Sequence, residues 1–370
     1  MNRSNRTGIY IHLPFCKVHC SYCDFPITTR TSLAQEYYEC LLREISMNPA
    51  PAADTLYFGG GTPSLAPPPV LQKIRGAFTL MDGSEITLEA NPDDVRPDVL
   101  KEWLAAGVTR LSLGIQSLEP EALRAALRQH TPDQAEEALR QARESGFNNI
   151  SADLILGLPL QTPSGFLRGI ERILDFRPQH LSLYFLEVHE NTALRKQMDR
   201  GRAAPMEEDD QLDCYERAVA MLLSSGYTHY EVSNFALPGF ESRHNLKYWT
   251  AAPTYAYGAG ACSYHDTLRI QNAASVTDYI AAVRAGRPPV ATSVAEDPDT
   301  RMRNTLIFGL RRREGVAIPE FERHYGVSPL ELFPDSGELL SGGFLEVQAG
   351  RLRLTFRGML LSNEILSRLV

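Results

Sequence analysis

Short apolar runs that are typical of β-strands alternate with longer amphipathic runs that are typical of helices, from residue 8 to about residue 190. In 97–106, for example, Leu100, Trp103 and Leu104 recur at helical spacing, and Gly107 follows as a stop signal. The pattern predicts strands over 8–13, 54–59, 85–90, 108–115, 149–156 and 180–187, and helices over 32–47, 67–80, 97–106, 119–128, 132–145 and 163–175.

This alternation determines how the strands pair. Strands that are separated by whole helices run parallel, and the connections between them are right-handed. Six such units predict an α/β fold, namely an incomplete (β/α)6 barrel similar to a TIM barrel. A further helix is predicted over 207–225, because the acidic residues 207–210 favour the positive end of a helix. We therefore assign residues 1–230 to a partial barrel.

The remaining residues predict two smaller regions. Residues 231–289 are rich in Gly, Pro and Tyr, which predicts a loop-rich extension packed over the barrel. Residues 290–370 predict a small C-terminal helical domain similar to a winged helix. The basic run 311–313 ends its first helix, and we interpret this run as a solvated helix end. The elements predicted in this domain are helices over 299–311, 318–325 and 357–369 and a hairpin over 344–356.

The overall charge and the absence of long apolar runs narrow the possible functions. Lys and Arg number 37 against 45 Asp and Glu, a formal charge of −8, which argues against a nucleic-acid partner. No apolar run approaches the length of a membrane span, and the first residues lack the apolar core of a signal peptide. We expect a cytoplasmic protein with reduced thiols, which touches a membrane only through partners.

Three cysteines stand directly after the first predicted strand, in the stretch YIHLPFCKVHCSYCDF. Cys16, Cys20 and Cys23 have the spacing C-x3-C-x2-C, so their thiolates can reach one metal centre from a single loop. No fourth cysteine follows in the loop. On a [4Fe–4S] cluster, three ligands leave one iron open for chemistry. The alternatives are a zinc site completed by His19 and a chance spacing.

Polar residues also stand at the ends of the later predicted strands, where parallel barrels carry their chemistry. A glycine run, 59–61, follows the second strand, and glycine lets a ligand approach the backbone because no Cβ intervenes. Glu89 follows the third strand, Gln116 follows the fourth, and Asp153 lies within the fifth. We expect these groups to face one cavity.

The cysteine run resembles the signature of the radical S-adenosylmethionine (radical SAM) superfamily, in which the open iron of a [4Fe–4S] cluster chelates the methionine part of SAM. The wider pattern, including the tail LRLTFRGMLLSNEIL, resembles the branch that contains oxygen-independent coproporphyrinogen III dehydrogenase (HemN) and the haem chaperone HemW. This likeness runs through about the whole chain. It implies a cluster on the three cysteines and SAM surrounded by Tyr10, Gly60, Gly61, Thr62, Glu89, Gln116, Arg128 and Asp153. The aromatic residues Tyr22 and Phe25, which stand within the cysteine run, are expected to shield its loop.

A histidine stands between aromatic residues in the predicted extension, as His244-Asn245-x-x-Tyr248-Trp249. Histidine is a common axial ligand of haem iron, and aromatic rings suit the face of a flat macrocycle. Ordinary packing is the alternative. In HemW-type proteins this segment is connected with haem binding, although HemN-type proteins carry a similar one. The resemblance therefore implies haem as a ligand of His244, Tyr248 and Trp249.

The resemblance leaves two main functions open, and a radical SAM enzyme with another substrate is a third. The first is a chaperone that binds a cluster, SAM and haem and delivers haem to acceptor proteins. The second is a HemN-like enzyme that cleaves SAM to a 5′-deoxyadenosyl radical and oxidatively decarboxylates the propionates of coproporphyrinogen III. No residue type needed to bind SAM is missing from the pattern. The sequence therefore leaves open whether SAM is cleaved or only bound.

Two features favour the chaperone. HemN-type proteins have an extra cysteine two places after the third, where this chain has Phe25. They also carry an N-terminal extension that helps to cover the substrate, whereas only fifteen residues precede Cys16. A radical intermediate needs protection from solvent, so a missing cover weakens the enzyme hypothesis.

Overall fold

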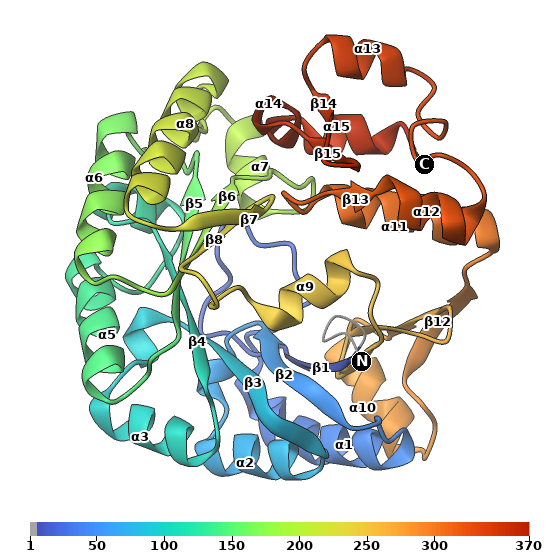
Figure 1. Ribbon diagram of the computed structural model, residues 1–370. Helices are drawn as coiled ribbons and strands as arrows, with labels where there is room; N and C mark the ends of the chain where they lie inside the picture. Colours follow the sequence, from blue (N-terminus) through green and yellow to red (C-terminus); the bar gives the residue numbers. More distant parts are fainter. Residues whose placement is uncertain (1–5, 370) are drawn as a thin grey trace.

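Six parallel strands form the centre of the computed structural model, which describes residues 6–369 (Figure 1). They pair in chain order, as the alternation of strands and helices predicts. All six predicted strands are present, although β3 begins at Leu80 rather than at residue 85. The strands are β1 (Thr7–Leu13), β2 (Ala53–Gly60), β3 (Leu80–Ala90), β4 (Arg110–Gln116), β5 (Ile150–Leu156) and β6 (His180–Phe185).

Helices cover the outer face of this sheet. Figure 1 shows α1, α2, α3, α5 and α6 following one another around the outside of the curved strands. Helices α2 to α6 have proline in their first turn, where its fixed φ and missing N–H do no harm. These helices are α1 (Ala34–Met47), α2 (Pro68–Gly76), α3 (Pro97–Ala105), α4 (Pro120–Ala125), α5 (Pro132–Glu144) and α6 (Pro163–Asp175), followed by α7 (Ala193–Asp199) and α8 (Glu208–Ser224).

Side chains alternate along each central strand between an apolar and a polar face. On β1, Ile9 and Ile11 are fully buried in the main apolar core. On β4, Leu111 and Leu113 belong to the same core, whereas Ser112 between them lines a cavity inside the barrel. Successive strand residues point to opposite faces, so the period-2 pattern gives the barrel an apolar outside and a polar inside.

The barrel does not close, which confirms the prediction of an incomplete barrel. One side of the sheet is extended beyond β6 by antiparallel strands, and the other side beyond β1 begins with a parallel one, β9. The twelve strands have the order β12-β11-β10-β9-β1-β2-β3-β4-β5-β6-β8-β7. The added strands are β7 (Thr228–Glu231), β8 (Asn234–Ala236), β9 (Thr254–Tyr257), β10 (Cys262–His265), β11 (Leu268–Asn272) and β12 (Val290–Ala295).

The segment 231–289 contains more regular structure than its composition predicts. Besides strands β8 to β11 it holds two helices, α9 (Arg243–Trp249) and α10 (Val276–Arg284). These strands are three to five residues long and lie between glycines and prolines, so no period develops that could be recognised in the sequence. The division of the chain near residues 230 and 290 stays a prediction.

The C-terminal region has its own apolar core and a three-stranded sheet, β13-β15-β14. Figure 1 shows it, in orange and red, beyond α9 and beside α8. The predicted helix 357–369 is interrupted at Leu361, and α13 was not predicted. The elements are α11 (Pro298–Leu310), β13 (Val316–Ala317), α12 (Ile318–Tyr325), α13 (Ser336–Ser341), β14 (Leu345–Gln348), β15 (Arg351–Leu354), α14 (Phe356–Leu360) and α15 (Ser362–Ser367).

The basic run 311–313 is not a solvated helix end, which corrects our interpretation. Its backbone joins the C-terminal region to the barrel: Val232 N–H donates to Arg311 O (3.0 Å), and Arg313 N–H donates to Tyr230 O (3.1 Å). All three arginines are partly buried. No helix within residues 6–369 is both long and apolar enough to cross a membrane.

Candidate functional site

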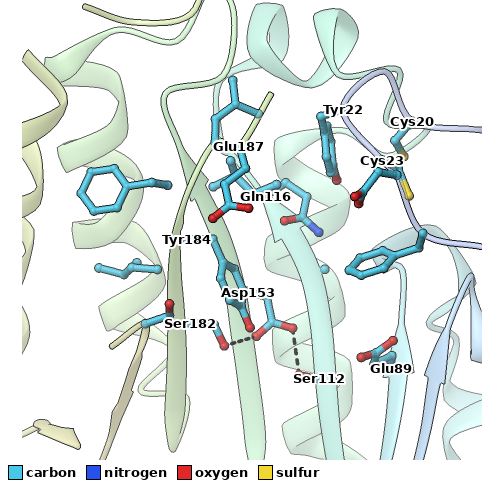
Figure 2. Close-up of a pocket in the computed structure, with 18 of the residues that line it drawn as sticks. Cys20, Tyr22, Cys23, Glu89, Ser112, Gln116, Asp153, Ser182, Tyr184 and Glu187 are labelled. Atoms are coloured by element: carbon cyan, nitrogen blue, oxygen red, sulfur yellow. Dashed lines mark hydrogen bonds between the residues drawn. The ribbon is translucent and has the colours of Figure 1, made fainter. Parts of the chain in front are cut away.

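A cavity of about 1050 Å³ lies inside the barrel at the carboxyl ends of the parallel strands. Eleven of the fifteen predicted site residues line it, and Figure 2 shows several of them facing the same space. The four that do not line it are Tyr10, His244, Tyr248 and Trp249. The eleven that do are Cys16, Cys20, Tyr22, Cys23, Gly60, Gly61, Thr62, Glu89, Gln116, Arg128 and Asp153.

The cysteine loop crosses the mouth of this cavity. Cys16 Sγ accepts a hydrogen bond from Thr62 Oγ1 (3.4 Å), and Cys20 Sγ accepts one from Arg128 Nη1 (3.6 Å). Burial raises the pKa of the Cys16 thiol and raises that of Cys23 to about 11. A bound metal displaces the proton of such a thiol. The three thiols, none of which is in a disulfide, are therefore available as metal ligands.

A zinc site completed by His19 is not formed. His19 Nε2 instead donates to the Cys23 carbonyl oxygen (3.0 Å). Among residues 6–369, no group of three or more His, Cys, Asp or Glu side chains is arranged to hold a single metal ion. An iron–sulfur cluster does not require the three thiolates to converge on one ion, because each thiolate binds a different iron. The arrangement fits a cluster better than a single ion.

The glycine run at the end of β2 is required by close packing. Gly60 has φ +115°, and a Cβ there would lie 2.7 Å from the His12 ring. A Cβ at Gly61 would lie 2.7 Å from the Pro14 backbone. The N–H groups of Gly60, Gly61 and Thr62 all donate within the protein. An amino group donates hydrogen bonds, so one bound at this segment would be held by the backbone carbonyl oxygens.

Two carboxylates lie on the cavity floor. Glu89 accepts hydrogen bonds from Tyr57 Oη (2.7 Å) and Gly60 N–H (3.2 Å), and burial raises its pKa to about 7. Asp153 has a different environment, because serines on β4, β5 and β6 donate to it; Figure 2 shows two of them, Ser112 and Ser182. The hydroxyls belong to Ser112 (2.8 Å), Ser151 (2.8 Å) and Ser182 (2.7 Å).

An arginine connects the cysteine loop with the strand ends. Arg128 Nη2 donates to Asn91 Oδ1 and to Gly114 O, both at 2.6 Å, and its Nη1 donates to Cys20 Sγ. Gln116, at the end of β4, has φ +64°, a conformation that a non-glycine residue rarely adopts. Such strain at a cavity wall is typical of binding sites.

His244, the predicted haem ligand, lies on α9 and does not line the cavity. Residues of the barrel and of α9 itself enclose its side chain. Its Nδ1 lies 2.9 Å from Thr55 Oγ1 and its Nε2 lies 3.1 Å from Tyr248 Oη. The imidazole stacks on Tyr57 with 5.0 Å between ring centroids and is 1% exposed. Burial lowers the pKa of His244 to about 3. Both ring nitrogens are thus occupied, and ligation of iron by His244 stays a prediction.

Of the other three residues outside the cavity, Tyr10 and Tyr248 contact this histidine and Trp249 lies beside Arg311. The ring of Tyr10 stacks on Tyr57 at 6.0 Å and on His244 at 6.3 Å. Tyr248 meets His244 edge to face, and Trp249 lies 5.5 Å from the guanidinium carbon of Arg311. Their roles in cofactor binding also stay predictions.

Comparisons with known proteins agree with this geometry. The sequence model of the Radical SAM superfamily matches residues 10–173, and that of the HemN C-terminal domain matches residues 297–361. "Heme chaperone HemW" of Lactococcus lactis is 33% identical and spans 97% of this chain and 96% of its own. "Heme chaperone HemW" of Bacillus subtilis is 34% identical, with 96% and 97% covered. This chain belongs to the radical SAM superfamily and, within it, to the HemW family.

A solved structure shows the same fold. Coproporphyrinogen III oxidase (HemN) from Escherichia coli superposes with a TM-score of 0.85 at 24% identity, over 99% of this chain and 90% of its own. Membership of the radical SAM superfamily also confirms the [4Fe–4S] cluster and SAM as cofactors. The cysteine loop, with free thiols that accept hydrogen bonds from Thr62 and Arg128, fits that cluster.

The structure adds site residues that the sequence analysis missed. Tyr57, Asn91 and Arg110 line the cavity, together with Ser112 and Ser182. Each lies on or just after a central strand, on the face opposite the apolar one. A polar residue at every second position of a strand with an apolar outer face was the signal that could have found most of them.

Proposed function

We propose that this HemW-family protein is a haem chaperone that binds a [4Fe–4S] cluster, SAM and haem and delivers haem to acceptor proteins. The observation that carries the proposal is the identity of 33% and 34% to two proteins named Heme chaperone HemW, over nearly the whole length of both chains. A shared domain alone would support much less, because one fold serves many functions.

The alternative, coproporphyrinogen III decarboxylation, has weaker support. The likeness to HemN is 24% in sequence, and at that level it supports the fold alone. HemN-type proteins have an additional cysteine where this chain has Phe25, and the Phe25 side chain is 64% exposed at the cavity. An apolar group in that place offers a contact surface to a ligand rather than a thiolate.

We assign the cavity to the cluster and SAM. Cys16, Cys20 and Cys23 would hold the cluster, which when bound supplies an open iron for SAM. The glycine run would accept hydrogen bonds from the amino group of SAM through its carbonyl oxygens. Glu89 and Asp153 would accept hydrogen bonds from its other polar groups. The positions of these side chains around one cavity support this assignment.

The proposal is tested by haem binding and haem transfer. Protein that has been reconstituted anaerobically with iron and sulfide is titrated with haem, and the absorption spectrum is followed. We expect stoichiometric binding, and we expect the loaded protein to pass haem to an apo-haemoprotein faster than free haem enters it.

The control is the alternative reaction, measured in the same preparation with coproporphyrinogen III, SAM and a reductant. Protein with an intact cluster that binds no haem, but turns over coproporphyrinogen III, would overturn the proposal. Tyr57, Glu89 and Asp153 would then have to be considered as part of a catalytic site.

A further inference from the structure

Two of the three cysteine sulfurs accept hydrogen bonds from side chains that line the cavity. Thr62 Oγ1 donates to Cys16 Sγ (3.4 Å), and Arg128 Nη1 donates to Cys20 Sγ (3.6 Å). Hydrogen bonds to the sulfurs of an iron–sulfur site are one of the factors that set its reduction potential. The two donors therefore affect how readily a bound cluster takes up an electron.

Both of these donors are bonded to the same side chain, that of Asn91, which also lines the cavity. Asn91 Oδ1 accepts a hydrogen bond from Arg128 Nη2 (2.6 Å), and Asn91 Nδ2 donates one to Thr62 Oγ1 (3.3 Å). The amide of Asn91 thus lies between the two groups that donate to the cysteine sulfurs. Through them it is connected to two of the three predicted cluster ligands.

The chemistry of its partners fixes the orientation of the Asn91 amide. A guanidinium has only donors, so the atom that faces Arg128 Nη2 has to be the amide oxygen. The amide nitrogen then faces Thr62, and because it can only donate, the Thr62 hydroxyl oxygen accepts from it. The single proton of that hydroxyl is left for the sulfur of Cys16. Asn91 therefore determines which way the Thr62 hydroxyl points.

The same amide also holds the guanidinium of Arg128. Its Nη2 donates to Asn91 Oδ1 and to Gly114 O, and with these two acceptors in place Nη1 is directed to Cys20 Sγ. The absence of a side chain at Gly114 leaves room for this arrangement. A Cβ there would lie 3.3 Å from Arg128 Nη2 and 3.6 Å from Asn91 Oδ1, so it would press on the guanidinium.

The backbone around Asn91 is tied to the cysteine loop. Asn91 directly follows β3, and its carbonyl oxygen accepts a hydrogen bond from Asp94 N–H (3.0 Å). The Asp94 side chain is 7% exposed, forms an ion pair with Lys17 of the cysteine loop and accepts a hydrogen bond from Ser64 Oγ (2.7 Å). The turn that carries Asn91 is therefore held in a defined position relative to the cysteines.

We infer that Asn91 is a positioning residue: through Thr62 and Arg128 it directs a hydrogen bond to each of two cluster ligands, and it thereby raises the reduction potential of the bound [4Fe–4S] cluster. Reduction adds negative charge to the cluster, and hydrogen-bond donors and a cation beside its ligands stabilise that charge. The inference concerns the cluster alone, and it holds whether or not the protein binds haem.

The test measures the midpoint potential of the cluster in anaerobically reconstituted protein without SAM, by a reductive titration that is followed by EPR. Asn91→Ala removes both contacts, so we expect a more negative potential. At a fixed solution potential the ratio of reduced to oxidised cluster should fall about tenfold, which is about 59 mV for a one-electron couple. Asn363→Ala is the matched control. Asn363 also lines the cavity and accepts from an arginine, Arg311, but it bonds to neither donor of the cysteine sulfurs.

A double-mutant cycle separates positioning from a general change in electrostatics. Thr62→Val removes the hydroxyl and should lower the potential of the wild type. Asn91→Asp keeps an acceptor for Arg128 but places a carboxylate oxygen where the amide donates, so the Thr62 proton turns away from Cys16. In that background Thr62→Val should shift the potential by less than half as much as in the wild type. The added negative charge is present on both sides of this comparison and cancels.

Iron and sulfide contents show which variants hold the cluster. An unchanged potential in cluster-loaded Asn91→Ala would overturn the inference, and so would equal shifts by Thr62→Val in the two backgrounds. If Asn91→Ala holds no cluster, the cycle with Asn91→Asp decides, because that side chain has nearly the same size. Loss of the cluster in Asn91→Asp as well would make Asn91 a residue required for cluster assembly, and its assignment to the reduction potential would be wrong.

Discussion

The buried polar groups at the two ends of the barrel interior are satisfied in different ways. At the end closed by α9, they bond to one another. Asp54 pairs with Lys247 Nζ (2.6 Å) and with Arg243 Nη2 (2.9 Å), and Glu85 accepts the backbone N–H of His244 (3.1 Å). Buried charges that are paired in this way hold a helix in place and leave little for a ligand.

At the cavity end, two buried guanidinium nitrogens, Arg110 Nε and Arg128 Nε, have no hydrogen-bond partner among residues 6–369. Arg110 is 1% exposed and lines the cavity. Burial raises the pKa of Glu89 to about 7 and raises that of Cys23 to about 11. Groups that are costly in the free protein are those a ligand can stabilise. The ion pairs at the α9 end are thus made within the protein, whereas the cavity end offers buried polar groups that a ligand could stabilise.

The largest effect is expected at the cavity end, from the cysteines. Cys16→Ala, Cys20→Ala or Cys23→Ala each removes a thiolate from a set of three, so we expect the cluster to be lost. Iron and sulfide analysis and the absorption of the reconstituted variants measure this. Cys262→Ala, which removes an exposed thiol outside the cavity, is the control. Full iron in all three variants would contradict the assignment of the cluster.

The next effect is expected at the α9 end. Asp54→Ala leaves Lys247, whose side chain is 4% exposed, without its partner. Removing one member of a buried ion pair costs about 3–5 kcal/mol, and we expect the free energy of unfolding to fall by about this amount. Denaturant unfolding measures it. Asp213→Ala breaks an exposed pair with Arg217 and should cost about 0.5 kcal/mol or less. Equal losses in the free energy of unfolding for the two variants would mean that the buried ion pair does not stabilise the packing of α9.

The third prediction concerns the pH dependence that Glu89 adds at the cavity floor. The unfolded chain loses this proton near pH 4.5, whereas the folded protein keeps it to about pH 7. The folded state therefore binds more protons in between, and the free energy of unfolding falls as the pH rises through this window. In Glu89→Gln, stability should therefore decrease less steeply between about pH 4.5 and 7. The thermal midpoints of the wild type and the variant, measured across this pH range, test this.

The stability of Glu89→Gln should still decrease somewhat as the pH rises, because burial also raises the pKa of Glu231 to about 7. Glu231→Gln therefore serves as the comparison, and the double variant should be flatter than either single one. An unchanged slope in Glu89→Gln would show that Glu89 is ionised throughout this range.

Much of the barrel could be predicted because its pattern is local. Each strand shows its period-2 alternation within a few consecutive residues, and the helical spacing of Leu100 and Trp103 is just as short. The groups at the strand ends could be placed in one cavity because parallel strands end on the same side. The cysteine spacing needed no structure at all.

The rest depends on contacts between distant parts of the chain. β9 pairs with β1 although more than two hundred residues separate them, and the basic run 311–313 bonds to residues 230–232. His244 is enclosed by Thr55 and Glu85, which belong to the second and third strands. No local pattern in the sequence indicates such pairs, so the packing of α9 against the barrel could not be predicted from the sequence.

The variant with the smallest expected effect tests whether α9 takes part in haem binding. Tyr248→Phe removes the single hydrogen bond that occupies His244 Nε2. One such bond contributes about 0.5–1.5 kcal/mol, so the free energy of unfolding should fall by no more than this. If the haem affinity and spectrum of the variant match those of the wild type, His244 Nε2 does not compete for the iron. If haem instead binds more tightly, the freed Nε2 competes for iron, and α9 belongs to the binding site rather than to the packing of the barrel.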